Sequence, residues 1–101
     1  MKLAALALTI LLALPGAASA ETLKGGLPAC MTPELLDQIM KAILDDDRQT
    51  GEGLLQAGCI ITKAGIPVTV LDTSVAGKVK VEAHNGDQSL VMWTVTQNVL
   101  P

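Results

Sequence analysis

The chain has 101 residues and a formal net charge of −3 at pH 7, from seven Lys and Arg against ten Asp and Glu. Binding to nucleic acid or to an anionic membrane surface depends on clustered positive charge, so this balance argues against both kinds of partner. The chain also has one Trp, no Phe and no Tyr. We therefore expect an aliphatic core, and a sugar or peptide groove built on aromatic stacking is disfavoured.

The first twenty residues have the pattern of a secretory signal peptide. Lys2 gives a positive start, Leu3–Leu14 is an apolar run, and Ala18-Ser19-Ala20 is a small-residue cleavage pattern. The apolar run is about a dozen residues long, whereas a helix needs about 20 to cross a bilayer. The pattern predicts cleavage before Glu21 and a periplasmic or secreted product, without a membrane span, in an oxidising compartment.

Removal of residues 1–20 leaves 81 residues with six basic and ten acidic side chains, a net charge of −4. A chain of this length supports one small domain. Residues 21–29 carry Gly25-Gly26 and no periodicity, which predicts an exposed or weakly held N-terminal arm. Residues 30–101 are then expected to form a single disulfide-stapled domain.

An amphipathic helix is predicted to follow Thr32, which is a suitable N-cap, and Pro33, which suits the first helical position. Apolar side chains recur there at helical spacing, at Leu35, Leu36, Ile39, Met40, Ile43 and Leu44. The acidic run Asp45–Asp47 is unfavourable at the negative end of a helix dipole, so the helix is expected to end there. A second helix is predicted from about Thr50 to Ala57, which places the helices at about residues 33–57.

The chain contains two cysteines, Cys30 and Cys59. Two cysteines in an exported chain allow one intramolecular bridge. A catalytic dithiol or a zinc site would usually need closely spaced cysteines or neighbouring histidine ligands. The sequence therefore predicts a Cys30–Cys59 disulfide, which closes a loop of about 30 residues and contributes roughly 3.5 kcal/mol by the loop-entropy relation.

After Gly58 the pattern changes from helical to alternating, which predicts short strands, at about residues 59–62, 68–71, 78–83 and 90–96. Asp72–Gly77 is expected to form a loop, and Asn85-Gly86 is a strong hairpin signal because both residues tolerate positive φ. Helices followed by antiparallel strands predict an α+β domain. We expect an N-terminal helical hairpin packed on a small antiparallel β-barrel of four to five strands, at about 59–101.

Three short segments of this half resemble the bacterial Src-homology-3-like (SH3-like) domains of exported proteins. Gly65–Asp72 is similar to a strand of that family that begins with glycine. Gly77–Val81 is similar to its central strand, and Trp93–Val95 is similar to its late strand that contains tryptophan. The resemblance covers residues 59–101 and implies a small barrel. Family members that bind cell-wall peptides use aromatic and polar groove residues, of which this chain supplies one aromatic side chain, so the resemblance supports the barrel more than wall binding.

Candidate chemical sites are few. His84 is the only histidine, and no serine or cysteine nucleophile is arranged beside it, which argues against acid–base catalysis. A calcium loop that starts at Asp45 would need glycine where Thr50 stands and glutamate where Gln56 stands. Trp93 is expected in the core rather than as a ligand platform. No cofactor and no metal ion are predicted.

The sequence favours a small non-catalytic module that binds a protein or a cell-envelope component. Because loops on a rigid scaffold often carry binding residues, the predicted contact residues lie in two turns: Asp72, Thr73, Ser74, His84, Asn85 and Asp87. An alternative is an inhibitor of a basic, lysozyme-like envelope hydrolase, which an acidic chain would suit. A hydrolase that uses carboxylates ranks below both, and the sequence fixes no oligomeric state.

Overall fold

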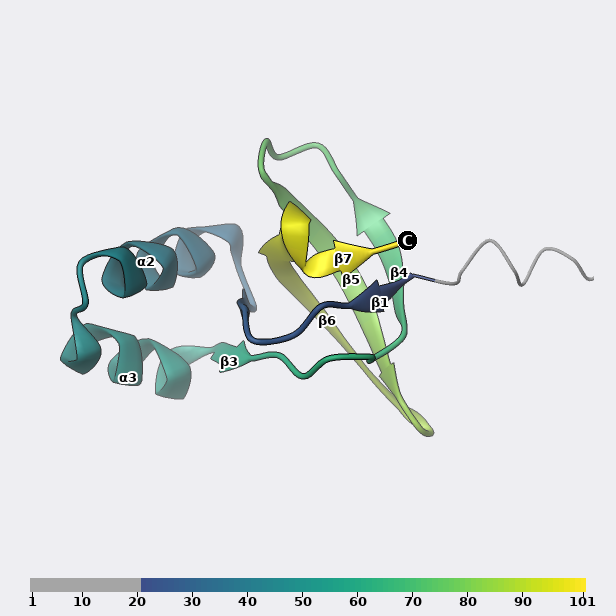
Figure 1. Cartoon of the computed structure of the whole chain (residues 1–101), viewed down its shortest axis with the longest axis horizontal. Helices are drawn as coiled ribbons and strands as arrows, with labels where there is room; N and C mark the ends of the chain where they lie inside the picture. Colours follow the sequence, from purple (N-terminus) through teal and green to yellow (C-terminus); the bar gives the residue numbers. More distant parts are fainter. Residues whose placement is uncertain (1–20) are drawn as a thin grey trace, which may run out of the picture.

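The computed structural model describes residues 21–101, so the predicted signal peptide lies outside the described residues. Figure 1 shows the two longer helices together on one side of the molecule and most of the strands on the other. In chain order the elements are β1 (Thr22–Leu23), β2 (Pro28–Cys30), α2 (Pro33–Leu44), α3 (Arg48–Ala57), β3 (Cys59–Ile61), β4 (Val68–Asp72), β5 (Lys78–Asn85), β6 (Gln88–Val95), the 3₁₀ helix η2 (Thr96–Asn98) and β7 (Val99–Leu100).

Both helices begin at side-chain caps. The Thr32 hydroxyl accepts a hydrogen bond of 3.1 Å from the backbone N–H of Leu35, as the sequence predicts for the start of α2. The Asp47 carboxylate accepts hydrogen bonds from the backbone N–H of Thr50, at 3.2 Å, and from its hydroxyl, at 2.7 Å. Asp47 is therefore the N-cap of α3, and this cap explains why α3 begins two residues before the predicted start.

The strands form an open five-stranded antiparallel sheet in the order β3-β2-β6-β5-β4, and β1 pairs with β7 in a separate two-stranded sheet. A single bridge between Thr22 and Pro67 links β1 to the residue before β4. The α+β class is correct, but the expected closed Src-homology-3-like barrel of four to five strands is wrong: the described residues form seven strands in two sheets. The difference arises because β1 and β2 supply pairing partners from a segment that was expected to be unstructured.

That segment, residues 21–29, is not an exposed arm. Leu23, Pro28 and Ala29 are buried. Backbone N–H groups of Leu23 and Lys24 donate to the carbonyls of Ile66, at 2.9 Å, and Asn98, at 2.8 Å. Since these partners lie far along the chain, no local periodicity could reveal the pairing.

Glycine is required where the N-terminal segment passes the connection between β3 and β4. Gly25 has a φ of 85°, a backbone conformation that side-chain-bearing residues rarely adopt. A Cβ at this position would meet the backbone of Ala64. The missing side chain therefore allows residues 24–28 to lie against residues 62–65.

The β5–β6 hairpin is confirmed, with its loop shifted by one residue. Asn85 pairs with Gln88, so the two-residue loop is Gly86-Asp87 rather than Asn85-Gly86. Gly86 has a φ of 65°, and Asp87 does not have a positive φ. This pattern matches a type II′ turn, which requires positive φ only at its first central residue.

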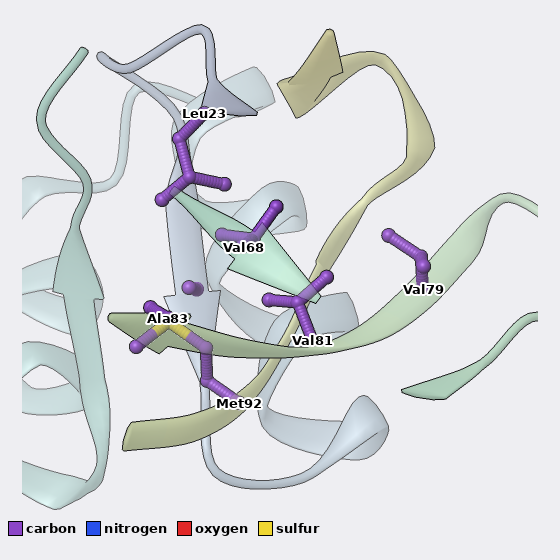
Figure 2. Packing of buried hydrophobic residues seen from close by; sticks show 7 residues of the cluster. Leu23, Val68, Val79, Val81, Ala83 and Met92 are labelled. Carbon is purple, nitrogen blue, oxygen red and sulfur yellow. The ribbon is translucent and has the colours of Figure 1, made fainter. Parts of the chain in front are cut away.

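The molecule has two hydrophobic clusters, and β6 contributes to both because successive side chains of a strand point to opposite faces. Met92 belongs to the sheet cluster, which is shown in Figure 2 and contains Leu23, Ala29, Val68, Val79, Val81, Ala83 and Met92. Val95 belongs to the helix cluster, which contains Cys30, Leu36, Ile39, Leu54, Cys59 and Val95. Trp93 is partly buried and packs against the helix cluster, as expected for a core residue.

The predicted disulfide between Cys30 and Cys59 is confirmed. The two residues face each other across β2 and β3, and both are buried in the helix cluster. The backbone N–H of Met31 donates to the carbonyl of Gly58, so the cysteines occupy the adjacent non-hydrogen-bonded position, where opposite side chains come closest. The bridge therefore joins the chain just before α2 to the chain just after α3.

A buried polar network joins segments that are distant in the sequence. The Asn98 amide nitrogen donates to the hydroxyls of Thr62 and Thr94, each at 3.0 Å, and its oxygen accepts from the backbone N–H of Gly25, also at 3.0 Å. The Thr62 and Thr94 hydroxyls donate in turn to the carbonyls of Leu27 and Pro28, each at 2.8 Å. The three side chains thus satisfy each other and hold the N-terminal segment against η2 and β6.

Candidate functional site

The predicted contact residues do not form one surface. Asp72, Thr73 and Ser74 lie where β4 ends, and Asn85 and Asp87 lie at the β5–β6 turn. These two places are at opposite ends of β5, whose eight residues extend about 23 Å at 3.3 Å per residue. A ligand that contacts both turns would have to span the length of the sheet.

Asp72 has a structural role in its turn. Its carboxylate accepts a hydrogen bond of 2.7 Å from the backbone N–H of Ser74. Hydrogen bonds from the side chain and backbone of Ser74, with a smaller contribution from the charge of Lys80, hold the pKa of Asp72 below its ordinary value. Thr73 lines a groove of about 360 Å³ at this end of the sheet.

His84 is held by the sheet rather than presented to a ligand. Its ring Nε2 lies 2.9 Å from the hydroxyl of Thr69, and its backbone N–H donates to the carbonyl of Pro67. The side chain is half-buried on β5. This geometry ties β5 to the start of β4.

A concave surface lies at the hairpin end of the sheet. We call it the sheet groove; it has a volume of about 560 Å³ and is lined by Leu23, Ile60, Ile61, Thr62, Lys63, Ile66, Ala83, Asn85, Gln88, Ser89 and Leu90. Aliphatic side chains make most of its wall, and the polar groups stand at the β5–β6 turn and at Thr62 and Lys63. Of the predicted contact residues, Asn85 belongs to the sheet groove.

The register of the hairpin explains why this groove is apolar. Val81 and Met92 are paired and buried in the sheet cluster. The next pair on the same face is Ala83 and Leu90, and there Leu90 is already 51% exposed. The sheet groove is therefore the open end of the aliphatic core.

Sequence reasoning missed the wall of the sheet groove, although a signal was present. A half-buried strand alternates apolar and polar side chains, yet the chain has Ile60-Ile61 and Leu90-Val91. Adjacent side chains of a strand point to opposite faces, so in each pair one aliphatic side chain cannot lie on the core face. In fact all four side chains are between 44% and 51% exposed.

Two of the three carboxylates in the acidic run Asp45–Asp47 make local contacts. Asp45 forms an ion pair of 2.9 Å with Lys41, and Asp47 caps α3. Within residues 21–101 no group of three or more His, Cys, Asp and Glu side chains is placed to hold a metal ion. The same part of the chain contains no helix that is long and apolar enough to span a membrane.

Comparison of the chain with protein-family models, with curated proteins and with solved structures finds no match.

Proposed function

We propose that the protein is a small exported, non-catalytic binding module, and that the sheet groove receives an apolar part of its partner, a protein or a cell-envelope component. The observation that carries the proposal is the exposed aliphatic wall of the groove. Ile60, Ile61 and Leu90 are 44%, 48% and 51% exposed around a concavity of about 560 Å³.

Covering this wall contributes favourable free energy to the binding of a ligand. Full burial of an aliphatic side chain contributes about 1.5–3 kcal/mol, so covering the exposed half of each of the three contributes about 1 kcal/mol per residue. Asn85, Gln88 and Ser89 add hydrogen-bonding groups at the rim, which is the usual composition of a ligand site: apolar walls with a few polar groups that orient the ligand.

A second candidate function, inhibition of a basic envelope hydrolase, is favoured by the shape of the β5–β6 hairpin. Its end extends beyond the rest of the sheet in Figure 1, and residues 85–91 are all exposed. Asp87 places a carboxylate in the turn. A projecting hairpin with an acidic tip suits insertion into a cleft that carries positive charge.

Two adjacent residues of β6 provide a matched test of the proposal. Leu90 lines the sheet groove, whereas Val91 points to the opposite face of the strand and does not line it. Both are about half exposed, and Leu90→Thr and Val91→Thr each replace exposed aliphatic surface with a β-branched, hydroxyl-bearing side chain that suits a strand.

The isotopically labelled protein is titrated with soluble peptidoglycan fragments in one series and with a basic lysozyme-type hydrolase in another. We expect one series to shift the amide signals of residues 60–63 and 85–90. Leu90→Thr should weaken that binding about five-fold, the equivalent of about 1 kcal/mol, and Val91→Thr less than about two-fold. The proposal is wrong if both series leave these amides unchanged, or if the two variants behave alike.

The activity of the same hydrolase distinguishes the binding module from the inhibitor. Inhibition predicts that the protein slows turnover of peptidoglycan and that Asp87→Asn weakens this effect, because the carboxylate at the tip is lost. Binding of peptidoglycan fragments without any change in turnover would favour the binding module instead.

A further inference from the structure

Charge is divided unequally between the helices and the rest of the molecule. Residues 33–57 carry six acidic and two basic side chains, a net charge of −4. The remaining described residues, 21–32 and 58–101, carry four of each, a net charge of zero. The acidity of the described protein therefore resides in its helical region.

This acidic region contains a groove with an apolar base. We call it the helical groove; it lies between the end of α2 and the start of α3, has a volume of about 270 Å³ and is lined by Ala42, Ile43, Asp46, Asp47, Arg48, Gly51, Glu52 and Leu55. Ala42 is buried, while Ile43 and Leu55 are 52% and 41% exposed. The adjacent Leu44 is 81% exposed.

The carboxylates at the helical groove outnumber its cations. Asp46, Asp47 and Glu52 stand against the single cation Arg48. Across the described residues the ion pairs are Lys41–Asp45 and Lys78–Asp37, so neither Asp46 nor Glu52 is neutralised by a basic side chain. Exposed aliphatic area bordered by free carboxylates is a surface for a ligand that is both apolar and basic.

We propose that the helical groove binds a short basic polypeptide segment of another protein. The segment places an aliphatic side chain against Ile43 and Leu55, and Lys or Arg side chains beside Asp46 and Glu52. This surface is separate from the sheet groove, and the proposal does not depend on the function proposed for the latter.

Charge complementarity selects this occupant over the alternatives. A second copy of the chain that used the same surface would bring two regions of net charge −4 together, which is repulsive. An anionic lipid surface meets the same repulsion. A basic segment, by contrast, gains electrostatic attraction and covers aliphatic side chains that are otherwise half exposed.

The test uses a fluorescent synthetic peptide of Lys and Leu arranged as an amphipathic helix, with binding to the purified, oxidised protein measured by fluorescence anisotropy at low salt. Asp46→Asn combined with Glu52→Gln should weaken binding about five-fold, from two exposed charge interactions. Asparagine suits position 46 because the backbone φ there is 54°, a region that asparagine tolerates. Ile43→Ser should weaken binding by a similar factor.

Three controls make the result specific to the helical groove. Glu34→Gln combined with Glu21→Gln removes two charges outside the groove and should change affinity less than about two-fold. A peptide in which Ser replaces Leu should bind more weakly, because it lacks the apolar contact. Melting temperatures of all variants establish that each is folded.

The proposal is overturned if the control pair of substitutions weakens binding as much as the groove pair, since binding would then reflect net charge alone. Equal binding of the serine peptide, or an unchanged affinity of Ile43→Ser, overturns it as well. Sedimentation of the protein by itself gives a further check: a dimer that Ile43→Ser dissociates would mean that a second copy covers the groove.

Discussion

The helical region and the sheet are held together by different kinds of contact. The helices depend on local caps, on the Cys30–Cys59 bridge and on a small cluster around Leu36, Ile39 and Leu54. The sheet depends on pairings between segments far apart in the sequence and on the hydrogen bonds of Asn98. One strand, β6, packs side chains into both clusters.

This comparison shows how one small domain can present two different surfaces. Because β6 contributes to both clusters, the two regions share one folded unit. The surfaces differ because charge is concentrated on the helices, while exposed aliphatic side chains line the groove of the electrically neutral sheet. Four sets of substitutions test this division, beginning with the disulfide.

Replacement of both cysteines, Cys30→Ala with Cys59→Ala, should have the largest effect. The expected loss is about 3.5 kcal/mol in the free energy of unfolding, because the loop between the residues is no longer closed. Urea denaturation measures this loss. Amide hydrogen exchange should accelerate more in α2 and α3 than in β5, because the bridge lies in the helix cluster. A loss below about 1 kcal/mol, or equal acceleration in all three elements, would show that the disulfide does not mainly stabilise the helices.

Asn98→Ala tests the hydrogen bonds that stabilise the sheet. The substitution leaves the N–H of Gly25 without its acceptor and the hydroxyls of Thr62 and Thr94 without their donor. We expect a loss of about 2–3 kcal/mol in urea denaturation, from buried polar groups that lose their partners. Gln97→Ala, at an exposed neighbour in η2, is the matched control. Similar losses in the two variants would show that the network does not stabilise the sheet.

Asp47→Ala removes the cap of α3 and has a smaller, pH-dependent effect. Hydrogen bonds from the side chain and backbone of Thr50 hold the pKa of Asp47 below its ordinary value of 3.8. A lowered pKa in the folded state stabilises the protein above pH 3.8, and this contribution is lost as the pH falls through the folded-state pKa. The melting temperature of the variant should therefore be a few degrees lower at neutral pH, and the difference should narrow below pH 3.8. A difference that stays constant from neutral pH to pH 2 would rule out this role of the carboxylate.

Lys78→Met has the smallest expected effect. Lys78 and Asp37 form an ion pair of 2.8 Å between β5 and α2, in which Asp37 remains 67% exposed. Pairs this exposed contribute about 0.5 kcal/mol, and salt screens them. The variant should unfold at a slightly lower urea concentration than the wild type at low salt and at the same concentration in high salt. A salt-independent loss would show that the ion pair is not its cause, because methionine keeps most of the aliphatic length of the lysine side chain.

The parts of the fold that the sequence predicted are those with local signals. Thr32 and Pro33 mark the start of α2 within one turn, and two cysteines leave one possible bridge. The division into two sheets was not predictable in this way, because Thr22 and Leu23 pair with residues 99 and 100, and a two-residue strand has no periodicity. The sheet groove was missed for a related reason: Ile60 and Leu90 belong to strands that were recognised, but their exposure depends on where the core ends.

Chemical-shift mapping can establish whether the two surfaces of the protein bind different ligands. The isotopically labelled, oxidised protein is titrated with the Lys and Leu peptide, and amide shifts are compared between the helical groove and the sheet groove. We predict that the shifts concentrate in residues 42–55 and that the amides of residues 60–63 and 85–90 stay in place. Shifts centred on the sheet groove, or spread evenly over both regions, would contradict the account.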